Sequence, residues 1–532
     1  MCSVGNMASE LFSRRGLLLG AGASFGAARL LAQPARTAPA GEFSVAAFGA
    51  RGDGKTLDTG AVNQAIEAAA SAGGGTVRFA PGNYLCYSIH LKSKVTLYLE
   101  HGATILAADA PATGSTGYDA AEPNTWDKFQ DFGHSHWRNS LIWGEDLADI
   151  RILGPGLIYG KGLSKGNGPG PRAQDPGVGN KAISLKNCRN VTLRDFAILQ
   201  GGHFGILATG VDNFTIDNLI IDTNRDGIDI DCCRNVRVSN TSVNSPWDDA
   251  ICLKSSFGLG FARATEMVTI TNCMVSGSFA LGSLLDGSFQ PLPAGENAPR
   301  TGRIKFGTES NGGFKNVTIS NCVFDGCGGL ALESVDGALL EDVTITNITM
   351  RDIVNAPIFL RLGRRMRGPE GVPVGKLRRV IISNIACSNA ASRYGSILSG
   401  IPGHAIEDVK IRDVYVQHQG GGTREMAALQ PPEDETGYPD PSRFGAMPSH
   451  GFFIRHVKNL EISNVEIEPR KPDLRPAFWV NDVQDAALFR VKAPRVAGVP
   501  AFAISSARNV SVTASQPLLK DSQIDVVERI EL

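Results

Sequence analysis

The chain has 532 residues, of which 42% are hydrophobic and 20% are charged, so we expect a large buried core. Its formal net charge is −1 and its positive charges are scattered, which argues against nucleic acid as a partner. After the N-terminus, no uninterrupted apolar run approaches the roughly 18 residues that a membrane-spanning helix needs. Glycine is abundant, at 61 residues, and aromatic residues make up 7%, a composition that favours short strands and tight turns.

The first 40 residues predict an export signal. Arg14 and Arg15 precede a stretch rich in Gly, Ala and Leu, and Ala38-Pro39-Ala40 offers a small-residue cleavage site. Twin-arginine signals export folded proteins, so we expect the mature chain to fold in the cytoplasm and to act in the periplasm or outside the cell. We expect residues 41–532 to form a single domain. The alternative is an apolar N-terminus without a targeting role.

The cysteines predict buried structural thiols. The sequence has ten, of which Cys2 lies in the signal. The remaining odd number, without a Cys-x-x-Cys pair, indicates neither a metal site nor a full disulfide framework.

The next predicted elements form a cap. Residues 49–54 predict a turn, and Asp58 to Ala72 carries apolar residues at helical spacing, with Asp58 or Thr59 as the N-cap. Residues 73–84 predict a turn, a strand and a second turn. A helix over the end of a stack of strands protects its exposed edge.

A short pattern, Asn or Asp followed by apolar, polar and apolar residues, recurs along the rest of the chain. Copies lie at Asn190, Asn213, Asn235, Val268, Asn316, Asp342, Val380, Asp408, Asn459 and Asn509. The tightest spacings between copies are about 22 to 26 residues. The alternation and this repeat length predict an all-β fold, a right-handed parallel β-helix with apolar residues turned inward. Asn at a fixed position suits a left-handed turn. A leucine-rich repeat, the nearest alternative, needs a Leu grid and a helix in each repeat, and neither is visible.

Insertions interrupt the repeat and are expected along one rim, where solenoids often build their binding face. They cover residues 109–140, 160–181, 278–303, 363–377 and 418–451. The first insertion carries Trp126, Phe129, Phe132, His134, His136 and Trp137. These aromatic residues either stack on sugar rings or form the packed core of the loop itself.

Two aspartate-rich segments, residues 224–231 and 246–254, predict the chemistry. Asp226 and Asp249 are 23 positions apart, about one coil, so stacking places them on neighbouring strands roughly 4.8 Å apart. Glycoside hydrolysis needs one protonated and one ionised carboxyl group, and closely held like charges raise one pKa. We predict Asp226, Asp248 and Asp249 to be catalytic and Lys254 to temper their repulsion or bind substrate. The alternative is a set of turn residues or a Ca²⁺ site.

These motifs resemble glycoside hydrolase family 28, the polygalacturonase family, from about residue 42 to 415. Residues 224–227, Asn-Arg-Asp-Gly, resemble the family's Asn-Thr-Asp-Gly, and residues 248–254 resemble its Asp-Asp-Cys-Ile-x-Ile-Lys motif. Residues 48–54 and 73–75 resemble its pectate-lyase-type cap. The resemblance implies an inverting hydrolase of a pectic polysaccharide. It implies that Asp249, or its neighbour Asp248, is the general acid, and that Asp226 and the other member position and activate water.

Two motifs of that family are missing here. No histidine stands where Gly-His-Gly is expected, and Glu333 occupies the place of the Arg-Ile-Lys that grips a galacturonate carboxylate. Arg303-Ile304-Lys305 has those letters one coil early and is either a coincidence or a relocated cationic site. We therefore favour rhamnogalacturonan-type or other α-linked neutral sugars over homogalacturonan. The candidate substrate-binding residues are His203, Arg225, Lys254, Arg303, Lys305, Glu309 and Glu333, with His134 and His136 as weaker candidates.

Two other functions compete with hydrolysis. A polysaccharide lyase on the same fold would use Ca²⁺ and an Arg or Lys base. Arg225, Asp229 and Asp231 are compatible with this alternative. A non-catalytic carbohydrate-binding solenoid is favoured by the missing motifs. Hydrolysis itself needs no metal and no cofactor, so we expect neither. The sequence does not give the oligomeric state.

Overall fold

The computed structural model describes residues 41–111, 116–166, 172–293 and 298–532. The predicted export signal, residues 1–40, lies outside these described residues. Within the described part of the chain, no helix combines the length and the apolar character needed to cross a bilayer.

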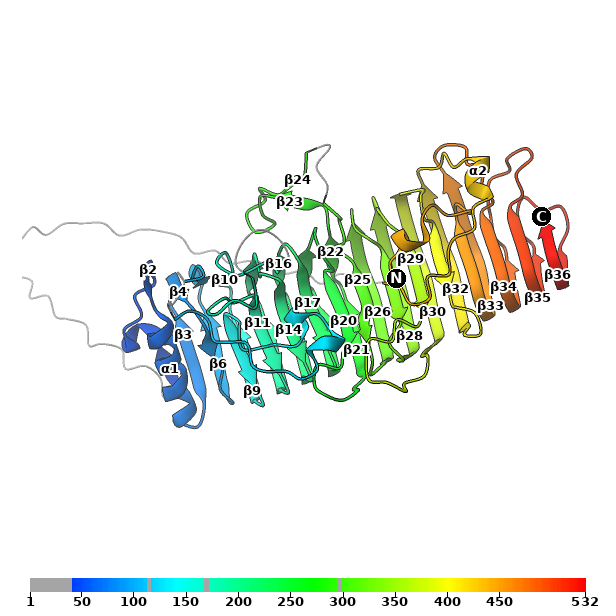
Figure 1. The fold of residues 1–532 in the computed structure, drawn as a ribbon. Helices are drawn as coiled ribbons and strands as arrows, with labels where there is room; N and C mark the ends of the chain where they lie inside the picture. Colours follow the sequence, from blue (N-terminus) through cyan, green and yellow to red (C-terminus); the bar gives the residue numbers. More distant parts are fainter. Residues whose placement is uncertain (1–40, 112–115, 167–171, 294–297) are drawn as a thin grey trace, which may run out of the picture. The chain divides into compact units, whose positions relative to one another are not determined.

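Strands of successive coils stack in parallel rows (Figure 1). The row that carries the aspartate motifs contains β5 (Ile89–His90), β8 (Ile142–Glu145), β11 (Lys181–Lys186), β14 (Phe204–Thr209), β17 (Asp226–Asp231), β20 (Ile251–Ser255), β25 (Ile304–Ser310), β27 (Leu330–Ser334), β29 (Ile358–Leu362) and β31 (Ser396–Ser399). The predicted parallel β-helix is confirmed.

A second row carries the repeat pattern. It contains β1 (Glu42–Ser44), β3 (Gly75–Phe79), β6 (Val95–Leu99), β9 (Ala148–Leu153), β12 (Arg189–Arg194), β15 (Asp212–Asp217), β18 (Arg234–Ser239), β21 (Thr265–Thr271), β26 (Phe314–Asp325), β28 (Leu339–Arg351), β30 (Lys376–Ala390), β32 (Ile406–His418), β33 (Phe452–Pro469), β34 (Phe478–Phe489) and β35 (Phe502–Thr513). The sequence pattern missed the coil of β34, because Ala486 replaces the larger apolar residue of the pattern and Ala487 replaces its polar residue.

A third row completes each coil. It contains β2 (Asp53–Leu57), β4 (Gly82–Cys86), β7 (Ala103–Ala107), β10 (Leu157–Tyr159), β13 (Ala197–Leu199), β16 (Ile220–Asp222), β19 (Ser242–Asn244) and β22 (Met274–Ser276). Both β21 and β22 pair with β26, so from there on one long strand serves the second and third rows.

Asparagines occupy the predicted left-handed turns. Asn213 and Asn235 both have φ of 55°. The Asn213 amide donates to Asn190 Oδ1 at 2.9 Å, and the Asn235 amide donates to Asn213 Oδ1 at 3.2 Å. This ladder links equivalent positions in successive coils, and the asparagine interpretation is confirmed.

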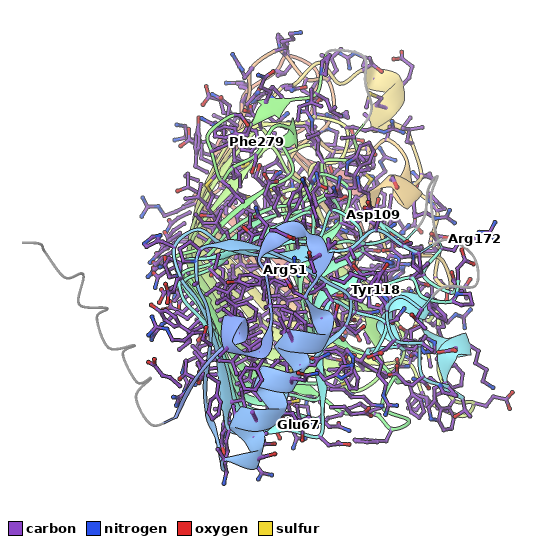
Figure 2. All side chains as sticks on the ribbon, turned by 90° about the vertical axis from the view of Figure 1, so that its left-hand side faces the viewer. Arg51, Glu67, Asp109, Tyr118, Arg172 and Phe279 are labelled. Atoms are coloured by element: carbon purple, nitrogen blue, oxygen red, sulfur yellow. The ribbon has the colours of Figure 1, made fainter. Side chains whose placement is uncertain are left out.

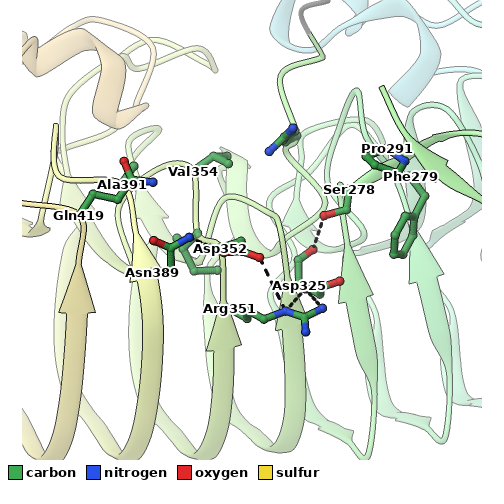
Figure 3. A pocket seen from close by; sticks show the side chains of 12 residues that line it. Ser278, Phe279, Pro291, Asp325, Arg351, Asp352, Val354, Asn389, Ala391 and Gln419 are labelled. Carbon is green, nitrogen blue, oxygen red and sulfur yellow. Dashed lines mark hydrogen bonds and ion pairs between the residues drawn. The ribbon is translucent and has the colours of Figure 1, made fainter. Parts of the chain in front are cut away.

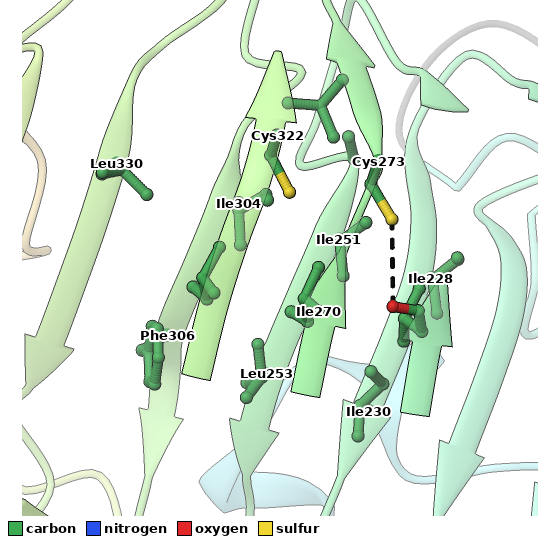
Figure 4. Packing of buried hydrophobic residues seen from close by; sticks show 14 of the residues in the cluster. Ile228, Ile230, Ile251, Leu253, Ile270, Cys273, Ile304, Phe306, Cys322 and Leu330 are labelled. Atoms are coloured by element: carbon green, nitrogen blue, oxygen red, sulfur yellow. Dashed lines mark hydrogen bonds between the residues drawn. The ribbon is translucent and has the colours of Figure 1, made fainter. Parts of the chain in front are cut away.

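The interior of the coils is apolar (Figure 4). Ile228, Ile230, Ile251 and Leu253 are fully buried, and Ile228 pairs with Ile251 in register. Each such side chain contributes about 1.5–3 kcal/mol on burial, so stacking neighbours stabilises every coil. The nine cysteines of the described residues are buried and unpaired, which confirms their predicted structural role.

The two ends of the stack differ. Helix α1 (Thr59–Ser71) lies across the N-terminal end, as predicted (Figure 2). Asp58 precedes it, but its carboxylate accepts hydrogen bonds from the amides of Arg51 and Gly52 at 2.8 and 2.9 Å instead of capping the helix. At the other end, β36 (Ser522–Glu531) pairs antiparallel with β35.

The insertions contain short elements. These are the 3-10 helices η2 (Asp127–Phe129), η3 (Phe132–His134) and η4 (Pro441–Phe444), the short helix α2 (Arg424–Ala427), and the antiparallel pair β23 (Phe279–Leu281) and β24 (Gln290–Pro291). One more 3-10 helix, η1 (Val45–Phe48), lies in the cap.

Candidate active site

The strand register brings the two aspartate motifs together. Because Ile228 pairs with Ile251 and the Gly227 amide donates to the Asp249 carbonyl at 3.0 Å, Asp226 and Asp249 occupy equivalent places on neighbouring coils. Both are buried, with exposed fractions of 3% and 2%. The prediction that Asp226 and Asp249 lie one coil apart is therefore confirmed.

Two cations hold the Asp249 carboxylate. Arg303 Nε donates to Oδ1 at 2.9 Å, and Lys305 Nζ lies 3.1 Å from Oδ2. Burial alone would raise the pKa of Asp249, but Lys305 and Arg303 outweigh it and lower this pKa to about 2. Of the two alternatives for Arg303-Ile304-Lys305, the geometry favours a cationic site, and its anionic partner is Asp249.

Asp226 and Asp248 have the opposite character. Burial, followed by the charges of Asp229 and Asp248, holds the pKa of Asp226 well above its ordinary value. Burial and the Asp249 charge raise the pKa of Asp248, although Arg225 Nη2 donates to its Oδ2 at 2.7 Å and opposes the shift. Carboxylate oxygens of the two residues and a ring nitrogen of His203 lie within 4.8 Å of one another. This pair can carry a proton beside an ionised Asp249.

Glu333 shares the cations of Asp249. Its carboxylate lies 3.8 Å from Lys305 Nζ and 4.0 Å from Arg303 Nη2, and neither oxygen has a hydrogen-bond partner. Burial raises the pKa of Glu333 to about 7, against the pull of Lys305 and Arg303. Asp440 and Tyr438 also approach, with Asp440 Oδ2 at 3.7 Å from Arg303 Nη2 and the Tyr438 hydroxyl at 3.3 Å from Lys305 Nζ. Sequence reasoning missed both, because only the insertion at 418–451 marked their segment.

Lys254 and Glu309 form a second ion-pair group. Lys254 Nζ lies 3.1 Å from Glu309 Oε2 and 4.0 Å from Asp229 Oδ2. Arg367 pairs with the other Glu309 oxygen. Burial works against an ionised Glu309, yet Lys254 and His134 hold its pKa well below the ordinary range. Both oxygens of Glu309 are thus engaged within the chain.

The first insertion lies over this group. His134 Nε2 is 3.2 Å from Asp229 Oδ2, and the His134 ring packs against Phe204 with centroids 4.7 Å apart. Trp126 and Phe129 contact Phe257 at centroid distances of 5.1 and 5.6 Å. Of the two alternatives for these aromatic residues, the structure favours the packed loop core. His134, a weaker candidate from sequence, thus contacts Asp229 at the site.

A cavity of about 260 Å³ opens beside the carboxylates and is lined by Asp131, Phe132, Gly133, Gly166, Ala173, Gln174, His203 and Arg225. A larger one of about 410 Å³ lies elsewhere, between β22, β26, β28 and β30, and contains the Arg351–Asp325 ion pair at 2.8 Å (Figure 3). The wall of the smaller cavity contains two candidate substrate-binding residues, His203 and Arg225, and the wall of the larger cavity contains no candidate site residue, so chemistry assigns the smaller one to the site.

Comparison with known proteins finds two family models that match parts of the chain. Residues 125–287 match the family described as "Glycosyl hydrolases family 28", and residues 42–141 match "Rhamnogalacturonase A/epimerase, pectate lyase-like". A probable polygalacturonase of Vitis vinifera is 26% identical over 384 residues, covering 65% of this chain and 74% of that protein. An exo-poly-alpha-D-galacturonosidase of Dickeya chrysanthemi is 25% identical over 257 residues, covering 40% of this chain and 42% of that protein.

Solved structures show the same fold. The family 28 exopolygalacturonase of Yersinia enterocolitica superposes with a TM-score of 0.58 at 19% identity, covering 90% of this chain and 79% of that chain. The Thermotoga maritima exopolygalacturonase gives 0.53 at 19% identity, covering 71% and 88%. The recognition of family 28 from the aspartate motifs is confirmed over residues 125–287, and the protein is a glycoside hydrolase built on a right-handed parallel β-helix.

Proposed function

We propose that this glycoside hydrolase cleaves α-glycosidic bonds in a pectic polysaccharide by acid/base catalysis, with inversion at the anomeric carbon. One observation carries the mechanism. Asp249 is held ionised by two cations, while the adjacent Asp226 and Asp248 have raised pKa values. An acid and a base are therefore both present in one buried site. The polygalacturonases among the similar proteins support the pectic substrate.

The proton is assigned to the Asp226–Asp248 pair. It passes to the leaving glycosidic oxygen as the bond from that oxygen to the anomeric carbon breaks. Asp249 takes a proton from the water that adds to this carbon. The family resemblance allows either Asp249 or Asp248 as the general acid. The low pKa of Asp249 disfavours Asp249 in this role and favours Asp248, whose side chain is a quarter exposed.

The charge balance favours a neutral sugar next to Asp249. Arg303 and Lys305 already face the carboxylates of Asp249 and Glu333. A uronate carboxylate would have to compete with both for the same two cations. A rhamnogalacturonan-type polymer, which offers neutral residues, fits this subsite better than homogalacturonan. The match of residues 42–141 to a rhamnogalacturonase-related family supports the same choice.

We also propose export by the twin-arginine route. Nine unpaired cysteines would be at risk of random oxidation if the chain folded in an oxidising compartment. Because all nine are buried in the folded protein, folding before export protects them. The Arg14-Arg15 pair supplies the matching signal.

A product assay tests the hydrolase. Homogalacturonan, rhamnogalacturonan and side-chain fractions are incubated with the enzyme, with and without EDTA, beside the variant Asp249→Asn. Asp286→Asn, a change on an exposed loop, is the matched control. We expect new reducing ends on rhamnogalacturonan, unaffected by EDTA and lost in Asp249→Asn alone, with the inverted anomer visible first by NMR. A chelator-sensitive, unsaturated, ultraviolet-absorbing product would instead establish a lyase.

A further inference from the structure

The segment from residue 118 to residue 137, here called the strap, is fixed across the site. Its anchors are hydrogen bonds from Asn124 to the Gly258 carbonyl at 3.0 Å and from Trp137 Nε1 to Thr209 Oγ1 at 3.0 Å, the Trp126–Phe257 ring contact, and the ion pair between Asp131 and Arg367 at 3.2 Å. These anchors lie on different coils and on a second insertion. The strap is therefore a wall of the site, and the position of His134 is set by its anchors.

His134 and Asp229 present unsatisfied polar atoms to the site. Their exposed fractions are 5% and 0%. His134 Nε2 faces Asp229 Oδ2 at 3.2 Å, and His134 Nδ1 and Asp229 Oδ1 have no hydrogen-bond partner. Asp226 Oδ1 is also buried and without a partner. One ligand atom from each of the three residues lies within 4.8 Å of the others. Buried polar groups are almost always hydrogen-bonded, so this cluster indicates a bound polar group.

The charges around the cluster favour a neutral group over a metal ion. Lys254 Nζ lies 4.0 Å from Asp229 Oδ2 and pairs with Glu309, which also pairs with Arg367. A divalent cation at the cluster would be repelled by both of these positive side chains. A hydroxyl group adds no charge, can donate to the Asp229 carboxylate and can accept from a His134 N–H.

We propose that His134 and Asp229 bind neighbouring ring hydroxyls of the sugar that borders the scissile bond and thereby set the sugar selectivity. This inference rests on the proposed function, because it places a sugar beside Asp226. Both residues touch the substrate hydroxyls, and neither exchanges a proton with the leaving oxygen.

The variants His134→Ala, His134→Gln and Asp229→Asn test the pair. The structure does not bear out His136 as a substrate-binding candidate, because both of its ring nitrogens are satisfied within the strap, by Glu122 O and Asp127 Oδ2 at 2.5 and 3.1 Å. His136→Ala is therefore the matched control. Binding of galactose, rhamnose, galacturonic acid and a series of monodeoxy galactosides is measured by calorimetry, together with kcat and KM on the cleaved polymer. Loss of a hydrogen bond to a charged group weakens binding on the order of 10- to 100-fold.

We expect His134→Ala and Asp229→Asn to lose this factor in Kd and KM, and His136→Ala to keep the wild-type affinity. At least one monodeoxy sugar should bind the wild-type enzyme more weakly than its parent sugar does. The same monodeoxy sugar should bind His134→Ala no more weakly than its parent sugar does. Equal losses of affinity in His134→Ala and His136→Ala would contradict the proposed role of His134 and Asp229. Stoichiometric binding of Zn²⁺, Mn²⁺ or Ca²⁺ by the wild-type enzyme that is lost in His134→Ala would also contradict it. If no polymer is cleaved but the sugar binding follows this pattern, the proposed function fails and the pair stands.

Discussion

Substituting Arg303 by Gln tests whether Asp249 must be ionised for activity. Arg303 Nε donates to Asp249 Oδ1 at 2.9 Å inside a buried site. Lys305 and Arg303 together bring the Asp249 pKa from 3.8 to about 2, against the opposing effect of burial. If the two cations share this effect, each accounts for at least about one pKa unit, or about 1.4 kcal/mol. Arg303→Gln should therefore raise the Asp249 pKa by about one unit or more.

The assay is the pH dependence of kcat/KM. A base is active when ionised, so activity falls as the pH drops through its pKa, and a raised pKa moves this acid limb to higher pH. We expect a shift of about one unit in Arg303→Gln, and little shift in Arg303→Lys, which keeps the charge. Arg351→Gln is the control, because Arg351 is exposed and pairs with Asp325 away from the site. A folded Arg303→Gln enzyme with an unmoved acid limb would refute Asp249 as the base.

We expect three further outcomes. Arg225→Gln removes the first of the cations that lower the Asp248 pKa, so the protonated form persists to higher pH and the alkaline limb of kcat/KM should move to higher pH. Asn213→Ala should cost about 1–2 kcal/mol of unfolding free energy in a thermal or denaturant melt, because its φ of 55° suits Asn and Gly, and Asn213→Gly should cost less. Replacing Arg14 and Arg15 by Lys should retain the protein in the cytoplasm, seen by fractionation, with its activity intact.

The coils were predictable because solenoid geometry converts sequence spacing into spatial position. A separation of 23 residues between Asp226 and Asp249 is one coil, and strand register then fixes which residues are neighbours. The asparagine ladder follows from the same repeat. The prediction weakened where an insertion broke the spacing. The insertion at residues 278–303 lies between the coil of Asp249 and the strand that carries Lys305. The letters Arg-Ile-Lys alone therefore did not reveal that Arg303 and Lys305 face Asp249.

The loop-borne residues could not be predicted in this way. Tyr438 reaches Lys305 from 133 positions along the chain, and His134 reaches Asp229 from a segment with no repeat. No register relates an insertion to the coil over which it folds. Its contacts depend on its own packing, such as that of Trp126 on Phe257. The aromatic residues of the first insertion were equally compatible with sugar stacking and with this core.

The site therefore divides into two parts with separable effects. The coils hold Asp226, Asp248, Asp249 and Arg303, whose charges set the protonation states and hence the pH profile. The strap supplies His134, which we assign to the sugar hydroxyls. Because the strap is anchored independently of Arg303, substitution of His134 should change the relative rates on different sugars and leave the acid limb of the pH profile in place. Arg303→Gln should move the acid limb and leave the relative rates on different neutral sugars unchanged. If either variant produced both effects, the two parts would be energetically coupled and the division would be wrong.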